Sequence, residues 1–283
     1  MNRRQLFAFL CATLLLSGCK PPSPEAKLRV SMIPTTDPGG IARQSAPLID
    51  YLHRETGATI ELTVPTSYAA VVEALTSGKV DIAYLGGFTY VQASSRSSVT
   101  PLVQRLRDKD FHSLFITQPD SAIHSLADLK GHTFAFGDVN STSGHLMPSY
   151  YMREQNVDPA VIEKAIYTGG HDATALAVAN RKVDAGAMDE LVLQQMLKAG
   201  KLTSSQIRVF YTTPAFFDYV WVARSGLDPS LAEKFSQALL KLNAADPADR
   251  PLLDLLHAEK YDLAHEIDYN RLRQAAKDDG LLK

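Results

Sequence analysis

The chain has 283 residues, of which 45% are hydrophobic and 21% are charged. This composition is typical of one or two globular domains and excludes collagen-like, disordered and disulfide-scaffold proteins. The 29 Lys and Arg residues are offset by 31 Asp and Glu residues. Because no cationic excess is available to neutralise a phosphate backbone, we expect no nucleic-acid partner.

The N-terminus reads as a secretion signal. Two arginines precede an apolar run from Leu6 to Leu16, which is too short to cross a bilayer but suits the apolar core of a signal peptide. The run ends in LSGC at Cys19, which resembles a bacterial lipobox. That resemblance implies a lipoprotein signal peptide over residues 1–18, and a lipidated cysteine with its tether over residues 19–27.

Cleavage at this point has consequences for the mature chain. Cys11 leaves with the signal and Cys19 is acylated, so no free thiol remains. Disulfides, thiol redox chemistry and cysteine–metal sites are thereby excluded together. We expect a folded body in the periplasm or at the outer cell surface, held to the membrane by its N-terminal lipid. The alternative is an ordinary secretion signal that ends near a cysteine by chance.

Beyond the tether, strand and helix patterns alternate along the chain. The first set comprises strands at 27–32, 59–64 and 80–85 and helices at 41–56 and 68–77. The second comprises strands at 112–117, 133–136, 166–168 and 183–188 and helices at 125–131, 141–155, 172–179 and 190–199. A last strand at 219–223 is followed by helices. This alternation predicts two α/β units with parallel sheets.

Three consecutive hydroxyl residues, Ser141, Thr142 and Ser143, follow the strand at 133–136 and open a helix. The first turn of a helix has free backbone N–H groups and a positive dipole end, which favour anions. One hydroxyl is enough to cap a helix, so three in a row predict additional donors for a tetrahedral oxyanion.

Other strand ends carry more ambiguous signals. His171 follows two glycines and would either donate to an anion or lie exposed beside a helix cap. Tyr84 begins a turn with two glycines and two further aromatics, which either line a pocket or pack in the core. Asp189 and Glu190 end a strand; they would bind a ligand amine or simply begin a helix, where acids are favoured.

Motifs for catalysis are missing from the sequence. It contains no GxSxG, HExxH or GxxxxGK[ST], the signatures of hydrolase, zinc-peptidase and nucleotide sites. The histidines do not have the i, i+4 spacing of metal ligands. We therefore expect no enzyme activity, no metal and no cofactor.

Five stretches, in this order, resemble the periplasmic phosphate, phosphite and phosphonate-binding proteins of ABC transporters. They are VDIAYLGGFTYV, LADLKG, NSTSGHLMP, GGHDATALAVANRKVDAGAMDE and PAFFDYVWVARSGL. The resemblance implies a type II periplasmic-binding fold, in which two α/β lobes are joined by two crossing hinge strands. The implied lobes are residues 28–113 with 220–283 and residues 114–219, with crossings near 111–117 and 217–222.

The resemblance also implies ligand contacts. Four side chains of the second lobe would hold the oxyanion: Ser141, Thr142, Ser143 and His171. Tyr68 and Tyr84 would close over it from the first lobe. Members that take 2-aminoethylphosphonate hold its amine with carboxylates. Asp218 matches one such position, and either Asp189 or Glu190 matches the other.

The resulting expectation is a monomeric solute-binding lipoprotein that captures a phosphonate, phosphite or related phosphorus oxyanion between its lobes. It would deliver this ligand to the permease and ATPase of an ABC transporter. The alternative is a sensor subunit that presents the same bound anion to a membrane histidine kinase or chemoreceptor.

Overall fold

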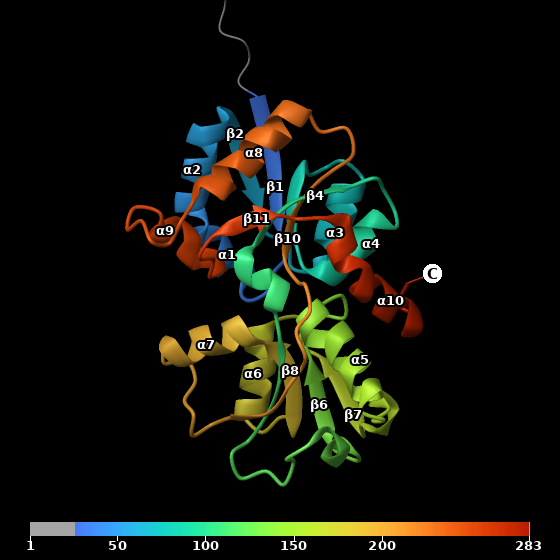
Figure 1. The fold of residues 1–283 in the computed structure, drawn as a ribbon. Coiled ribbons are helices and arrows are strands. Elements are labelled where there is room, and N and C mark those ends of the chain that lie inside the picture. The colour runs from blue at the N-terminus through green and yellow to red at the C-terminus, as the bar shows by residue number, and fades with distance from the viewer. Residues whose placement is uncertain (1–25, 283) are drawn as a thin grey trace, which may run out of the picture.

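The computed structural model describes residues 26–282 and shows two α/β lobes, one above the other, each built on its own sheet (Figure 1). The expected signal peptide, Cys19 and most of the expected tether lie outside the described residues. Within residues 26–282, no helix has the length and apolarity needed to cross a membrane.

The first lobe has a six-stranded sheet in the order β11-β4-β10-β3-β1-β2. Its strands are β1 (Ala26–Met32), β2 (Ala58–Thr63), β3 (Ile82–Leu85), β4 (Thr100–Arg105), β10 (Val220–Ala223) and β11 (Tyr261–Leu263). Its helices are α1 (Pro38–Gln44), α2 (Ala46–Thr56), α3 (Tyr68–Thr76), α4 (Gly87–Ser94), α8 (Pro229–Lys241), α9 (Arg250–Leu253) and α10 (Asn270–Asp278). Short 3₁₀ turns are η1 (Leu106–Asp110), η5 (Asp254–Leu256) and η6 (Glu266–Tyr269).

The second lobe has a five-stranded sheet in the order β7-β6-β8-β5-β9. Its strands are β5 (Ser113–Thr117), β6 (Thr133–Phe136), β7 (Lys164–Tyr167), β8 (Ala185–Asp189) and β9 (Arg208–Thr212). Its helices are α5 (Met147–Glu154), α6 (His171–Ala179) and α7 (Glu190–Lys198). It also holds the 3₁₀ turns η2 (Leu126–Leu129) and η4 (Pro159–Val161), and a π turn, η3 (Thr142–Leu146).

Both sheets have a continuous apolar interior. All four residues of β3 are buried, as expected for a strand covered by helices on both faces. Trp221 of β10, fully buried, packs on Phe235 of α8 with ring centroids 5.2 Å apart. The core of the first lobe is one large cluster, whereas two smaller clusters fill the second lobe.

The expectation of parallel sheets is wrong for one part of each lobe. β10 runs antiparallel to β3 and β4, and β5 runs antiparallel to β8 and β9. These are the strands next to the two crossings, where the chain passes from one sheet to the other. Three strands were not expected: β4, β9 and β11. β4 contains a proline, β9 is a half-exposed edge strand and β11 has only three residues, so none has a clear period-2 pattern.

Two expected helices are interrupted, in both cases near a proline. The helix expected at 41–56 divides at Ser45, because Pro47 begins a new helix. The helix at 141–155 was expected to be interrupted by Pro148; it begins as the π turn η3, and Pro148 lies in the first turn of α5. The π turn is the segment that contains the expected oxyanion-binding hydroxyls.

Two chain segments cross between the lobes side by side. The N–H of Phe111 donates to the carbonyl of Phe216 at 3.1 Å, and the N–H of Phe216 donates back at 3.0 Å. The crossings are shorter than expected, because residues from Ser113 already pair in the second sheet and residues from Val220 already pair in the first. We propose residues 28–113 with 220–283 and residues 114–219 as the two lobes, except that β1 of the first lobe begins at Ala26 and β5 of the second begins at Ser113.

Candidate functional site

The three hydroxyl residues lie at the boundary between the lobes and are almost fully buried, with exposed fractions of 2%, 2% and 1% for Ser141, Thr142 and Ser143. The Ser141 hydroxyl caps the turn by accepting a hydrogen bond from the N–H of Gly144 at 3.0 Å. A side chain at Gly144 would lie 2.9 Å from that hydroxyl and 3.0 Å from His171, so only glycine lets the turn pack against the imidazole.

Thr142 links this turn to the first lobe. Its hydroxyl oxygen accepts a hydrogen bond from the N–H of Phe88 at 3.0 Å. The neighbouring N–H of Gly87 donates to Asp218 at 3.0 Å. A helix leaves its first N–H groups without internal partners. In α4, the first of these groups donates to a carboxyl on a crossing segment and the second donates to a hydroxyl of the second lobe. Asp218 is thereby brought next to Thr142 in residues 141–144, here named the hydroxyl turn.

His171 lies at the N-terminus of α6 and is fully buried, so the alternative of an exposed histidine is wrong. Its backbone N–H donates to the carbonyl of Thr35, in the first lobe, at 2.9 Å. The backbone N–H of Asp189 donates to His171 Nδ1 at 3.2 Å. Because a backbone amide can only donate, Nδ1 must be the acceptor nitrogen, and the proton of the neutral ring resides on Nε2. Burial lowers the pKa of His171, which keeps the ring neutral.

Several polar atoms here are buried without a partner. Eight buried side-chain atoms of residues 26–282 lack a hydrogen-bond partner, and four of them belong to predicted site residues: Tyr68 Oη, Tyr84 Oη, His171 Nε2 and Asp218 Oδ2. Buried polar groups in folded proteins almost always have partners. Burial raises the pKa of Asp218 to about 7 and raises the pKa of Tyr68 well above its ordinary value. The four atoms comprise two tyrosine hydroxyls, one imidazole nitrogen and one carboxyl oxygen.

The structure separates the two candidate acids for an amine. Asp189 lies beside His171, but its carboxylate is engaged: Oδ1 accepts from the N–H groups of Leu191 and Val192 at 2.6 and 3.1 Å, capping α7. Glu190 accepts from the N–H of His112 at 3.3 Å, beside a crossing segment, and burial raises its pKa. The structure thus places Asp189 next to His171, and Glu190 next to His112.

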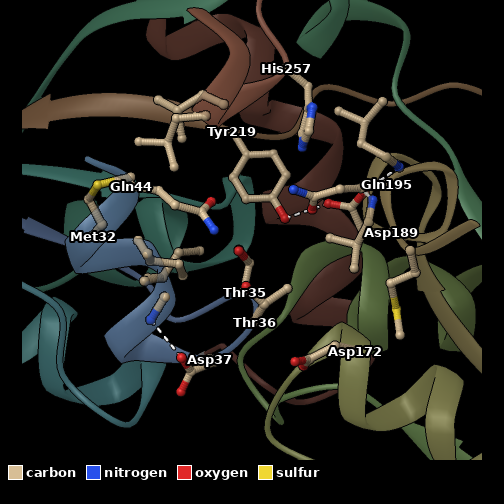
Figure 2. Close-up of a pocket in the computed structure, with 18 of the residues that line it drawn as sticks. Met32, Thr35, Thr36, Asp37, Gln44, Asp172, Asp189, Gln195, Tyr219 and His257 are labelled. Carbon is tan, nitrogen blue, oxygen red and sulfur yellow. Dashed lines mark hydrogen bonds between the residues drawn. The ribbon is translucent and has the colours of Figure 1, made fainter. Parts of the chain in front are cut away.

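A cavity of about 380 Å³ adjoins this cluster between the lobes, and Figure 2 shows Thr35, Gln44, Asp189 and Tyr219 around it. Of the predicted residues, only Tyr84 and Asp189 line it. Residues 141–143, His171 and Asp218 do not line it, although His171 contacts the lining residues Thr35 and Asp189. Among residues 26–282, no group of three or more His, Cys, Asp or Glu residues is arranged to hold a metal ion.

Sequence reasoning missed two residues that organise the site. Thr35 acts through its backbone carbonyl, which has no sequence signature. Tyr219 was expected only as the start of a strand, yet its hydroxyl donates to Asp189 Oδ2 at 2.8 Å. The Asp218–Tyr219 pair next to an apolar strand was the available signal.

A two-lobed α/β fold with an enclosed polar site at the lobe boundary defines the type II periplasmic binding proteins. Residues 30–269 match the family model described as "ABC transporter, phosphonate, periplasmic substrate-binding protein", and the chain belongs to this family. It is therefore the periplasmic substrate-binding component of an ABC transporter of the phosphonate and phosphate class, and not an enzyme.

Relatives with different ligands match the chain. The phosphate-import protein PhnD of Mycolicibacterium smegmatis is 32% identical, covering 80% of this chain and 78% of the relative. The probable ABC transporter phosphite binding protein PhnD1 of Prochlorococcus marinus is 27% identical, covering 88% and 89%. The structure of that PhnD1 in complex with methylphosphonate matches with a TM-score of 0.83, covering 89% of this chain and 98% of PhnD1.

Proposed function

We propose that this protein captures a phosphonate, phosphite or phosphate ion in the enclosed site between its lobes and delivers it to the permease and ATPase of its transporter. The observation that carries the proposal is a cluster of buried polar side chains. A side chain at Gly144 would meet Ser141 and His171, and one at Gly86 would meet Thr142 and Asp218. The Tyr68 side chain lies next to Ser141, and all of these residues are buried. The ligands named for the relatives, phosphite, methylphosphonate and phosphate, belong to the same class.

The donors proposed to bind the anion are neutral. The Nε2–H of His171, the hydroxyls of residues 141–143 and the N-terminal dipole of the turn would all be directed at the phosphorus oxygens. Four or five such hydrogen bonds at about 1.5–3 kcal/mol each give roughly 6–15 kcal/mol before the cost of ordering ligand and lobes. Micromolar to nanomolar dissociation constants are compatible with that balance.

Asp218 would discriminate between protonation states of the ligand. When protonated it donates to a ligand oxygen, and when ionised it accepts from a P–OH group. A fully deprotonated oxyanion facing an ionised Asp218 would meet a buried charge repulsion. The proposed site therefore requires one shared proton between carboxyl and ligand.

We further propose that the mature protein is a monomer anchored to the membrane by a lipid on Cys19, as the lipobox resemblance implies. The sensor role remains an alternative prediction, distinguished by whether permease and ATPase genes or a histidine kinase gene lie next to this one.

Calorimetry on residues 20–283, produced as a soluble protein, tests the proposed ligand. Phosphate, phosphite, methylphosphonate and 2-aminoethylphosphonate are each titrated at pH 7. We expect at least one to bind with a dissociation constant below about 10 μM. If none binds at millimolar concentration, the assignment of the hydroxyl turn as a phosphorus oxyanion site is wrong.

A further inference from the structure

The hydrogen bond between Tyr219 and Asp189 joins a crossing segment to the second lobe. The Tyr219 hydroxyl donates to Asp189 Oδ2 at 2.8 Å, and both residues are buried, with exposed fractions of 4% and 3%. The other oxygen of the Asp189 carboxylate caps α7. Both carboxylate oxygens are therefore already hydrogen-bonded within the protein.

The Tyr219 ring is held in place from three sides. It stacks on Tyr84 with centroids 5.3 Å apart and planes 8° from parallel. The edge-on ring of Phe111 lies 5.5 Å away, and the guanidinium of Arg105 lies 4.8 Å from the ring centroid. Aromatic and cation–π contacts of this kind each add to packing. The hydroxyl is thus presented to Asp189 by a pre-positioned ring.

This pair borders the 380 Å³ cavity, and its Asp189 also contacts His171. Tyr219 and Asp189 line the cavity on one side (Figure 2), while the backbone N–H of Asp189 donates to His171 on the other. A substituent on phosphorus that extends from His171 toward the cavity would therefore meet Asp189 and its partner Tyr219. The volume of the cavity itself is ample for such a group.

Building on the proposed function, we propose that Tyr219 is a specificity-determining residue that restricts the ligand to phosphorus oxyanions bearing only hydrogen, hydroxyl or methyl as the substituent. Its hydrogen bond withholds the Asp189 carboxylate from a ligand amine and closes the route to the cavity. An ammonium group entering here would displace the Tyr219 hydroxyl or be buried without two carboxylate partners, and burial of an incompletely paired charge is costly. 2-Aminoethylphosphonate is therefore disfavoured.

Calorimetry with three phosphonates tests this proposal: methylphosphonate, 2-aminoethylphosphonate and n-propylphosphonate, the uncharged analogue of equal length. The natural protein should bind methylphosphonate at least about 30-fold more tightly than 2-aminoethylphosphonate, a difference expected from one lost charged hydrogen bond. In Tyr219→Phe, the ratio of the affinity for methylphosphonate to that for 2-aminoethylphosphonate should fall by about 10-fold or more. The change should come chiefly from tighter binding of 2-aminoethylphosphonate, because Asp189 Oδ2 loses its hydrogen bond to Tyr219.

Two comparisons distinguish the effect of the ligand's ammonium charge from the effect of its length. In Tyr219→Phe, 2-aminoethylphosphonate should gain more than n-propylphosphonate, and the gain should vanish in the double variant Tyr219→Phe/Asp189→Asn. The matched control is Tyr269→Phe, which also loses one buried hydroxyl hydrogen bond, to Gln104 at 3.0 Å, and should leave the ratio unchanged.

The proposal is overturned if the natural protein binds 2-aminoethylphosphonate as tightly as methylphosphonate, or if Tyr219→Phe changes both affinities by one factor. Should Tyr219→Phe not fold, the single variant Asp189→Asn is measured instead. A selective loss of affinity for 2-aminoethylphosphonate would show that Asp189 already binds the amine and would overturn the proposal. Equal changes in affinity for 2-aminoethylphosphonate and methylphosphonate would support it. Absence of binding by all phosphorus compounds would instead defeat the proposed function.

Discussion

The hydroxyl of Thr142 in the second lobe accepts a hydrogen bond from the backbone N–H of Phe88 in the first lobe, at 3.0 Å. Thr142, a member of the hydroxyl turn, therefore also forms a contact between the lobes. The same hydroxyl hydrogen-bonds to the Asp218 carboxyl, which opposes the larger effect of burial on the pKa of Asp218. Under the proposed function, capture of the anion and approach of the two lobes would be coupled at this side chain.

Thr142→Ala should weaken binding of the preferred phosphorus oxyanion by about 5- to 150-fold. The substitution removes a donor to a charged ligand and the acceptor of the Phe88 N–H, a loss of about 1–3 kcal/mol. Calorimetry measures the change. Thr142→Ser keeps the hydroxyl and should stay near the natural affinity, and an unchanged affinity in the alanine variant would place the anion elsewhere.

Asp218 should make the ligand-free protein less stable as the pH rises from about 4 to above 7. Burial raises its pKa from 3.8 to about 7, so between these values the folded state holds a proton that the unfolded state has released. Stability is therefore highest below the unfolded pKa and falls as the pH rises through the folded pKa. The loss is up to about 4 kcal/mol, at 1.36 kcal/mol per pKa unit.

Denaturant unfolding at several pH values measures this effect without ligand. In Asp218→Asn the amide oxygen can still accept from the Gly87 N–H, and this part of the pH dependence should disappear. If the natural protein and the variant show the same pH dependence between pH 5 and 8, the Asp218 carboxyl is ionised in the folded state and the proton-sharing role is wrong.

His171 should be neutral at pH 7 with its proton on Nε2. The Asp189 N–H occupies Nδ1, and burial lowers the pKa of the ring below 6.5. Because the unfolded state takes up a proton first, this residue's contribution to stability is present above the ordinary pKa and is lost as the pH falls through the lowered folded pKa. Nitrogen-15 NMR of the imidazoles reports the tautomer directly, and a proton on Nδ1 at pH 7 would contradict the assignment.

The C-terminal helix α10 lies beside the lobe boundary (Figure 1), and an ion pair connects it to the second lobe. Asp279 directly follows α10 and pairs with Arg153 of α5. Since the arginine is partly exposed, the pair should contribute about 0.2–1 kcal/mol. In Asp279→Asn we expect ligand release to quicken by about 1.4- to 5-fold, because the lobes separate more readily.

Stopped-flow measurement of the release rate checks this prediction. Asp278→Asn is the control, since within residues 26–282 the Asp278 side chain accepts its hydrogen bond from Gln274 of its own helix, at 2.7 Å. Added salt should reduce the difference between the Asp279 variant and the natural protein. Equal release rates at low salt would mean that the pair does not hold the lobes together.

Cys19→Ala should move the protein from the membrane fraction to the soluble periplasmic fraction. The proposed lipid anchor needs this thiol, which is the only cysteine left after the expected cleavage. Fractionation and metabolic labelling with a fatty acid measure both consequences. A natural protein that is unlabelled and soluble would favour the ordinary secretion signal.

The features that are local in the chain could be predicted from the sequence. The hydroxyl turn depends on helix N–H groups and neighbouring hydroxyls, which follow from residues 141–144 alone. Most strands and helices also followed from periodicity, because each pattern repeats within one element. Short or half-exposed strands such as β4 and β11 lacked that repeat and were missed.

Only the tertiary structure decided what the acids and the histidine can do. Asp189 and Tyr219 are 30 positions apart, and Asp218 and Gly87 are 131 apart, so their pairing depends on how the crossing segments pack. The tautomer of His171 and the raised pKa of Asp218 likewise arise from burial and from partners supplied by distant strands and loops. Residue types therefore indicated an anion site, while desolvation and long-range hydrogen bonds determined which carboxyl remains available to the ligand.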